Sequence, residues 1–203
     1  MDAARTVVLR ELLSSSGWVE RTRGFARTLR TSTKNPGGLL LVGTPEEEPW
    51  HLAAHLDDES RLSGIAALAP TLVRWQVPQG APPHLSVTLR RLEAARRGET
   101  VFVVAEQAAP VPLLERVADA RKTGATVLTL DGGDAELEGL AHESLTVMEA
   151  DLVVPQLSFD TVQHLVSLAA GETGWSPGSG SRRGFRDRLA RALDVISGPA
   201  PRR

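Results

Sequence analysis

Short, almost continuously apolar segments alternate with helix-length segments along most of this chain. Leu39–Val42 and Thr100–Ala105 contain no charged residue, and residues 125–130 form a third run of the same kind. Strands of uniform apolarity are typical of parallel sheets, which are buried on both faces. Helix-length segments such as 112–122 and Phe159–Ala170 between or after them would serve as right-handed crossovers. The alternation predicts an α/β fold, a three-layer α/β/α sandwich around a parallel sheet.

Further elements are expected around this alternation. Residues 5–31 are expected to form two N-terminal helices. Strands are expected at 65–68, 72–77 and 144–148, and helices at 49–56, 84–97 and 135–141. One domain would span 5–171, followed by a Gly- and Ser-rich linker at 172–181 and a basic segment at 182–203. Within this last segment, 182–196 has the apolar spacing of an amphipathic C-terminal helix.

Composition excludes several classes of function. The 203 residues carry a formal net charge of −2, which predicts no general affinity for nucleic acid or for an anionic membrane. Because cysteine is absent, disulfides and thiolate metal sites are excluded, and a reducing cytoplasm is the expected location. The first residues lack the pattern of a signal peptide, and no window is apolar enough to cross a bilayer.

The segment from residue 38 to residue 56 has the layout of a phosphate cradle. A short apolar strand ends at Gly43, and a turn leads into a helix, whose free N–H groups attract anions. However, residues 46–48 are three glutamates, placed where the anion would sit. Three interpretations are open. The glutamates could be acids of the first helical turn that stabilise the helix dipole, one of them could fill the anion pocket as a built-in phosphate mimic, or they could attract a cationic ligand or partner.

Two histidines of the same segment stand four residues apart. His51 and His55 would therefore project from one face of a helix, a spacing that suits zinc, and His164 could approach from another helix. The alternative is a partly buried helix face at a subunit interface that carries both histidines. Zinc is the one metal cofactor that these residues suggest.

A second turn, Asp-Gly-Gly-Asp at residues 131–134, follows the run at 125–130. Open α/β sheets bind their ligands at the carboxyl ends of the strands. This turn therefore either contacts a ligand or only reverses the chain.

The order of these elements resembles the SIS (sugar isomerase) domain, and within it the phosphoheptose isomerase type, from about residue 5 to residue 171. Gly43 and the run His51-Leu-Ala-Ala-His55-Leu resemble the family's Gly-Asn-Gly-Gly-Ser-Ala and His-x-Ala-Ala-Glu-Leu motifs. Residues 98–110 stand where that family has a Gly-Asp pair, a strand and a Ser-rich loop. Residues 160–166 resemble the opening of its late, histidine-bearing helix.

Departures from the family motifs fall on its phosphate-binding and catalytic positions. The family's hydroxyl-rich loop corresponds to residues 105–110, Ala-Glu-Gln-Ala-Ala-Pro, which lack hydroxyls and add the charge of Glu106. The first loop is shorter than in the family, and Pro45 takes its serine position. His55 replaces the family's catalytic glutamate, while Thr161 and Ala169 replace two further zinc-site residues. The resemblance therefore implies the fold of a phosphosugar protein without its phosphate chemistry.

We expect a divergent, non-catalytic SIS-like protein that binds a carbohydrate derivative or acts as a regulatory module, and that self-associates. Its candidate ligand-binding residues are Gly43, Thr44, Glu48, Glu106 and Gln107, and its candidate catalytic residues are His51, His55 and His164. One alternative is a phosphosugar isomerase that uses His51 or His55 as its base and Arg61 or Arg74 for the anion. Another is a structural partner in an assembly that uses the basic segment at 182–203.

Overall fold

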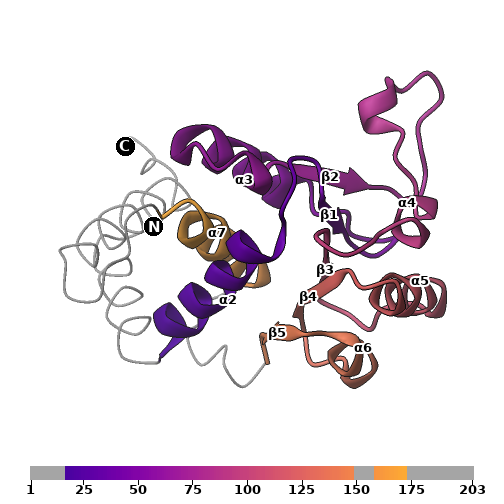
Figure 1. Ribbon diagram of the computed structural model, residues 1–203. Helices are drawn as coiled ribbons and strands as arrows, with labels where there is room; N and C mark the ends of the chain where they lie inside the picture. Colours follow the sequence, from indigo (N-terminus) through magenta and orange to yellow (C-terminus); the bar gives the residue numbers. More distant parts are fainter. Residues whose placement is uncertain (1–16, 149–157, 173–203) are drawn as a thin grey trace, which may run out of the picture.

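The computed structural model describes residues 17–148 and 158–172, which form three layers (Figure 1). Within this part of the chain, the middle layer is a parallel sheet of five strands in the order β2-β1-β3-β4-β5. The strands are β1 (Leu39–Val42), β2 (Pro70–Val73), β3 (Thr100–Ala105), β4 (Thr126–Asp131) and β5 (Glu143–Thr146). The α/β fold predicted from the sequence is confirmed.

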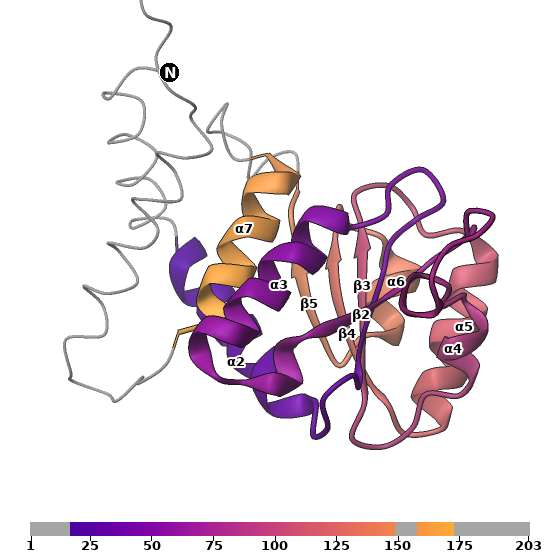
Figure 2. The same ribbon diagram turned by 90° about the horizontal axis from the view of Figure 1, so that it is seen from above.

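Helices cover both faces of this sheet, as Figure 2 shows from above. One face carries α2 (Trp18–Ser32), α3 (Trp50–Ser63) and α7 (Phe159–Ala170). The opposite face carries α4 (Arg90–Glu93), α5 (Val111–Lys122) and α6 (Ala135–Leu140). Two short 3-10 helices, η1 (Ala66–Leu68) and η2 (Pro83–Leu85), lie in the connections.

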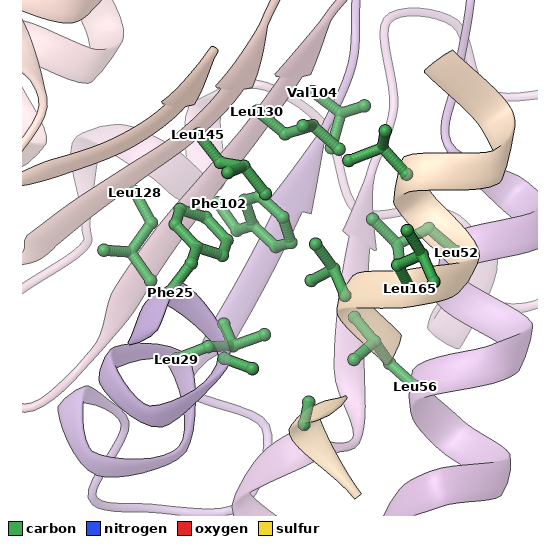
Figure 3. Packing of buried hydrophobic residues seen from close by; sticks show 14 of the residues in the cluster. Phe25, Leu29, Leu52, Leu56, Phe102, Val104, Leu128, Leu130, Leu145 and Leu165 are labelled. Carbon is green, nitrogen blue, oxygen red and sulfur yellow. The ribbon is translucent and has the colours of Figure 1, made fainter. Parts of the chain in front are cut away.

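The central strands contribute side chains to two separate hydrophobic cores, because successive side chains point to opposite faces of the sheet. Leu39 and Leu41 pack in the core under α2, α3 and α7, whereas Leu40 and Val42 pack in the core under α4, α5 and α6. In the first core the ring of Phe25 on α2 lies against that of Phe102 on β3, with centroids 5.4 Å apart (Figure 3). Burial on both faces explains the lack of polar alternation in these strands.

The helix predicted at 84–97 is wrong. Only η2 and the four-residue α4 are helical there, and the segment between them follows the sheet edge. The backbone N–H of Arg74 donates to the carbonyl of Val87 at 2.8 Å, and Arg74 forms a parallel bridge with Thr88. Edge pairing satisfies backbone groups that a helix would have satisfied internally, and β-branched Val87 and Thr88 suit it.

The region before that segment also differs from the prediction. The strand predicted at 65–68 is replaced by η1, and the one predicted at 72–77 is β2, which starts earlier and ends at Val73. The helix predicted at 49–56 continues to Ser63, where Gly64 ends it in a left-handed conformation with φ of 71°. Helix α7 has the predicted bounds.

Several predicted features lie outside the described residues. They are the first of the two N-terminal helices, the linker beyond residue 172 and the basic segment at 182–203. Among the described residues, the helices are all too short or too polar to cross a membrane.

Candidate functional site

The carboxyl edge of the sheet gathers most of the side chains that the sequence singled out. The loops after β1, β3 and β4 meet there, together with the first turns of α3 and α7. This edge is where open α/β sheets bind their ligands.

The loop after β1 is closed by its own hydrogen bonds. The N–H of Thr44 donates to the carbonyl of Glu47 at 3.1 Å, and the N–H of Glu47 donates to the Thr44 hydroxyl oxygen at 3.2 Å. A Cβ atom on Gly43 would lie 2.1 Å from the Glu47 carbonyl oxygen, so glycine is required for this close approach. The Thr44 hydroxyl and three backbone groups are therefore used inside the loop.

Glu48 is held between β1 and β2 as an internal anion. Its carboxylate accepts hydrogen bonds from the Arg74 Nε at 3.1 Å and from the Trp75 backbone N–H at 3.2 Å. The Arg74 guanidinium also lies 4.5 Å from the ring centroid of Trp50, and the indole N–H of Trp75 donates to the Gly43 carbonyl at 2.8 Å. The side chains of Glu48 and Arg74 are only 14% and 13% exposed.

One interpretation of the three glutamates is therefore wrong. Helix α3 begins at Trp50, and its first turn contains no acidic residue, so residues 46–48 precede the helix instead of complementing its dipole from within. The other two interpretations, a built-in phosphate mimic and attraction of a cationic ligand or partner, stay predictions.

The two arginines considered for binding a substrate anion have other partners. Arg74 pairs with Glu48, and Arg61 on α3 pairs with Asp57 and with Asp58, the latter at 3.4 Å. Both guanidinium groups therefore bind carboxylates of the protein itself.

The Glu47 carboxyl at this edge interacts with two carboxylates from other elements. Burial raises the pKa of Glu47, and the charges of Glu106 in the second loop and Asp160 on α7 raise it further. The negative charges that disfavour ionisation of Glu47 would also disfavour a phosphate group bound at the same place.

Two of the three candidate histidines meet where α3 packs against α7. The rings of His55 and His164 have centroids 4.4 Å apart with an interplanar angle of 66°. The His164 Nε2 lies 3.5 Å from the Asp160 carboxylate. Burial lowers the pKa of His164, the neighbouring His55 and His51 lower it further, and Asp160 opposes them. His51 is exposed.

Further ligands for a metal ion at these histidines would come from the side chains around them. Within residues 17–148 and 158–172, there is no group of three or more histidine, aspartate or glutamate side chains arranged to hold a metal ion. Zinc binding by His51 and His55 stays a prediction from their spacing.

Glu106 and Gln107 lie in a cleft that the sequence did not reveal. The cleft has a volume of about 460 Å³ and is lined by residues 106–108 after β3 and 132–136 after β4. The Asp-Gly-Gly-Asp turn is thus part of a concave surface. The sequence marked its aspartates as candidate ligand contacts, because they follow a strand. That the turn lies opposite Glu106 depends on β3 and β4 being neighbours in the sheet, which the sequence does not show.

Asp160 is a residue of this edge that the sequence did not single out as functional. It stands one helical turn before His164, so the spacing was a usable signal. The pKa of Glu47, by contrast, is affected by Glu106 and Asp160, which are distant in sequence, so no local pattern indicated it.

Comparison with known proteins adds structural neighbours. No protein-family model and no curated protein sequence matches the chain. A candidate sugar-binding protein from Salmonella typhimurium LT2 superposes with a TM-score of 0.57 at 16% identity, over 95% of this chain and 54% of that chain. A candidate phosphosugar isomerase from Silicibacter pomeroyi DSS-3 gives 0.51 at 15% identity, over 93% and 53% respectively.

A second candidate phosphosugar isomerase, from Salmonella typhimurium LT2, gives a TM-score of 0.54 at 14% identity, over 89% of this chain and 50% of that chain. The chain thus spans about half the length of these structures. At such low identity the likeness establishes a shared α/β fold, in agreement with the resemblance to SIS domains.

Proposed function

We propose that this chain is a divergent SIS-like module that binds a carbohydrate derivative at the carboxyl edge of its sheet, without catalysis. The observation that carries the proposal is the closed loop after β1, in which Thr44, Glu47 and Glu48 bond to protein groups. The fold shared with sugar-binding and phosphosugar isomerase proteins supports a sugar as the ligand class.

Electrostatics argue against a ligand bound through a phosphate. Glu47, Glu106 and Asp160 share this edge, and Arg74 is already neutralised by Glu48. A phosphate with a charge near −2 would be repelled by these carboxylates. The phosphoheptose-isomerase type of chemistry is therefore not part of the proposal.

Thermal denaturation with a panel of sugars, amino sugars and sugar phosphates tests the proposal. A ligand at 100 times its Kd adds about 2.7 kcal/mol to stability. For a chain of this size, that corresponds to an increase in Tm of about 5–10 °C. We expect such a shift with at least one unphosphorylated sugar, and no shift with any member of the panel would refute the proposal.

A phosphosugar isomerase is the second candidate, favoured by the contact of His164 with Asp160 at 3.5 Å. A carboxylate beside an imidazole can orient it as a general base, and isomerisation of an aldose to a ketose needs one base that moves a proton between adjacent carbons. An isomerase assay on the same sugar phosphates decides between the two. Turnover that His164→Gln abolishes would replace the first proposal with this one.

A further inference from the structure

The cleft between the loops that follow β3 and β4 has a composition unlike that of an anion site. We call it the β3–β4 cleft, formed by residues 106–108 and 132–136. It contains no lysine, arginine or histidine, and its charged side chains are Glu106, Asp134 and Glu136. An anionic ligand would find no cationic side chain in this lining.

Both walls of the β3–β4 cleft are fixed by hydrogen bonds. The Asp134 carboxylate accepts from the backbone N–H of Ala109 in the other loop at 2.7 Å, and it caps α6 by accepting from the backbone N–H of Glu136 at 3.0 Å. Gly132 N–H donates to the Ala105 carbonyl at 3.1 Å. A Cβ atom on Gly132 would lie 2.1 Å from the Glu106 carbonyl oxygen, so the two loops touch through their backbones.

A buried carboxylate fixes the β4 wall from behind. Asp131 is fully buried and accepts from the hydroxyls of Thr129 at 2.9 Å and Ser144 at 2.7 Å, and from the N–H of Gly133 at 3.0 Å. The cleft is thus preformed, which reduces the ordering cost of binding a ligand.

The groups left to face a ligand are those that pair with hydroxyls. Glu106, Gln107 and Glu136 are exposed, and no hydrogen bond or ion pair involves their side chains in the described part of the chain. Carboxylates accept hydrogen bonds from hydroxyl groups, and an amide both donates and accepts. Apart from Asp134, alanine and glycine form the rest of the lining, which lets a ring approach the backbone closely.

From this chemistry we propose that the β3–β4 cleft binds the vicinal hydroxyl groups of a sugar that carries no phosphate. Glu106 and Glu136 accept from the hydroxyls and Gln107 donates to a ring or hydroxyl oxygen. The inference rests on the proposed function and specifies its ligand class and its location, in the β3–β4 cleft and not in the closed loop after β1.

Amide chemical-shift titration of the 15N-labelled full chain tests this proposal. The probes are unphosphorylated hexoses and hexosamines and their 6-phosphates, each at concentrations up to the millimolar range. We expect at least one unphosphorylated sugar to shift the amides of Gln107, Ala108, Gly133 and Ala135. Its 6-phosphate should bind at least tenfold more weakly.

Matched variants assign the binding to the cleft. Glu136→Gln and Gln107→Ala change exposed side chains, so they should fold normally and raise the Kd of the sugar at least fivefold. Glu115→Gln removes the same charge from the exposed surface of α5, outside the cleft, and should leave the Kd unchanged.

The alternative outcomes separate the two proposals. Binding that shifts residues 43–48 instead, or that Glu136→Gln and Gln107→Ala do not weaken, overturns the cleft while carbohydrate binding stands. Tighter binding of a 6-phosphate overturns the ligand class alone. Failure of every probe to bind overturns both proposals.

Discussion

Glu48 is drawn away from solvent by the residues that follow strand β2. Arg74 and the backbone of Trp75 hold its carboxylate, and Trp50 covers the guanidinium. Removing one charge from such a pair leaves the other poorly compensated in a partly buried setting. The residue therefore fixes the loop after β1 to the edge of the sheet.

We expect Glu48→Gln to lower the free energy of unfolding by about 1–2 kcal/mol, because the amide keeps an acceptor for Trp75 but loses the charge that compensates Arg74. Chemical denaturation at pH 7 measures the change. Glu46→Gln is the matched control, since Glu46 is exposed, and its effect should stay within about 0.5 kcal/mol. Equal effects of the two variants would contradict the structural role of Glu48.

At the scale of elements, the packing of α3 against α7 brings two ionisable rings together. The rings of His55 and His164 touch, with His51 and Asp160 nearby, so protonation of His164 changes the energy of the helix pair. Figure 2 shows the two helices side by side over one face of the sheet.

Stability should consequently depend on pH below about 6.5, the ordinary pKa of histidine. The pKa of His164 is lowered in the folded chain by burial and by His55 and His51, so the unfolded chain binds more protons in this range. Its contribution to stability is present above pH 6.5 and is lost as the pH falls toward the folded pKa. The raised pKa of Glu47 acts in the opposite direction, at lower pH.

Urea denaturation between pH 5 and pH 7.5 measures this dependence. His164→Gln should flatten the profile over that range, whereas His84→Gln, which changes an exposed histidine of η2, should leave it as in the wild type. An unchanged slope in His164→Gln would show that the helix contact does not set the pH response.

The elements differed in how readable they were from sequence. Strands β1 and β3 and helices α5 and α7 followed from apolar runs and helix-length spacing, which are local properties. Residues 84–97 had a helical pattern, but pairing of Arg74 with Val87 and Thr88 overrode it. A partner distant in sequence decided the outcome, and no local pattern contains that partner.

The same reason limited prediction of the site. The spacing of His51 and His55 could be read directly, but the contact of His55 with His164 depends on how α3 packs against α7. The role of Glu48 depends on Arg74, which the sequence presented only as a free cation for an anion. Charge type was predictable, whereas the pairing of charges was not.

At the scale of the whole molecule, the chain is about half as long as the solved structures with its fold. Self-association is a prediction from the sequence, and Leu62 near the end of α3 is the first position to test, because it is 80% exposed. Large exposed apolar side chains are common at interfaces between subunits.

We expect light scattering to give a dimer, with twice the 21.8 kDa mass of one chain. Leu62→Glu should weaken the dimer at least tenfold. Val111→Glu makes the same change at a 63% exposed residue on the opposite side of the sheet and should not weaken it. A monomer at all concentrations would contradict self-association, and an unaffected dimer would place the interface elsewhere.

The contact between Gly43 and the Glu47 carbonyl also limits how this fold can change. Exchanging the glutamates for serines would not by itself create a phosphate loop, because the space above Gly43 is filled by backbone at 2.1 Å from a Cβ position. The chain would first need inserted residues to lift Glu47 away, together with release of Glu48 from Arg74. Substitutions alone would therefore leave this loop closed, and opening it requires a change in its length.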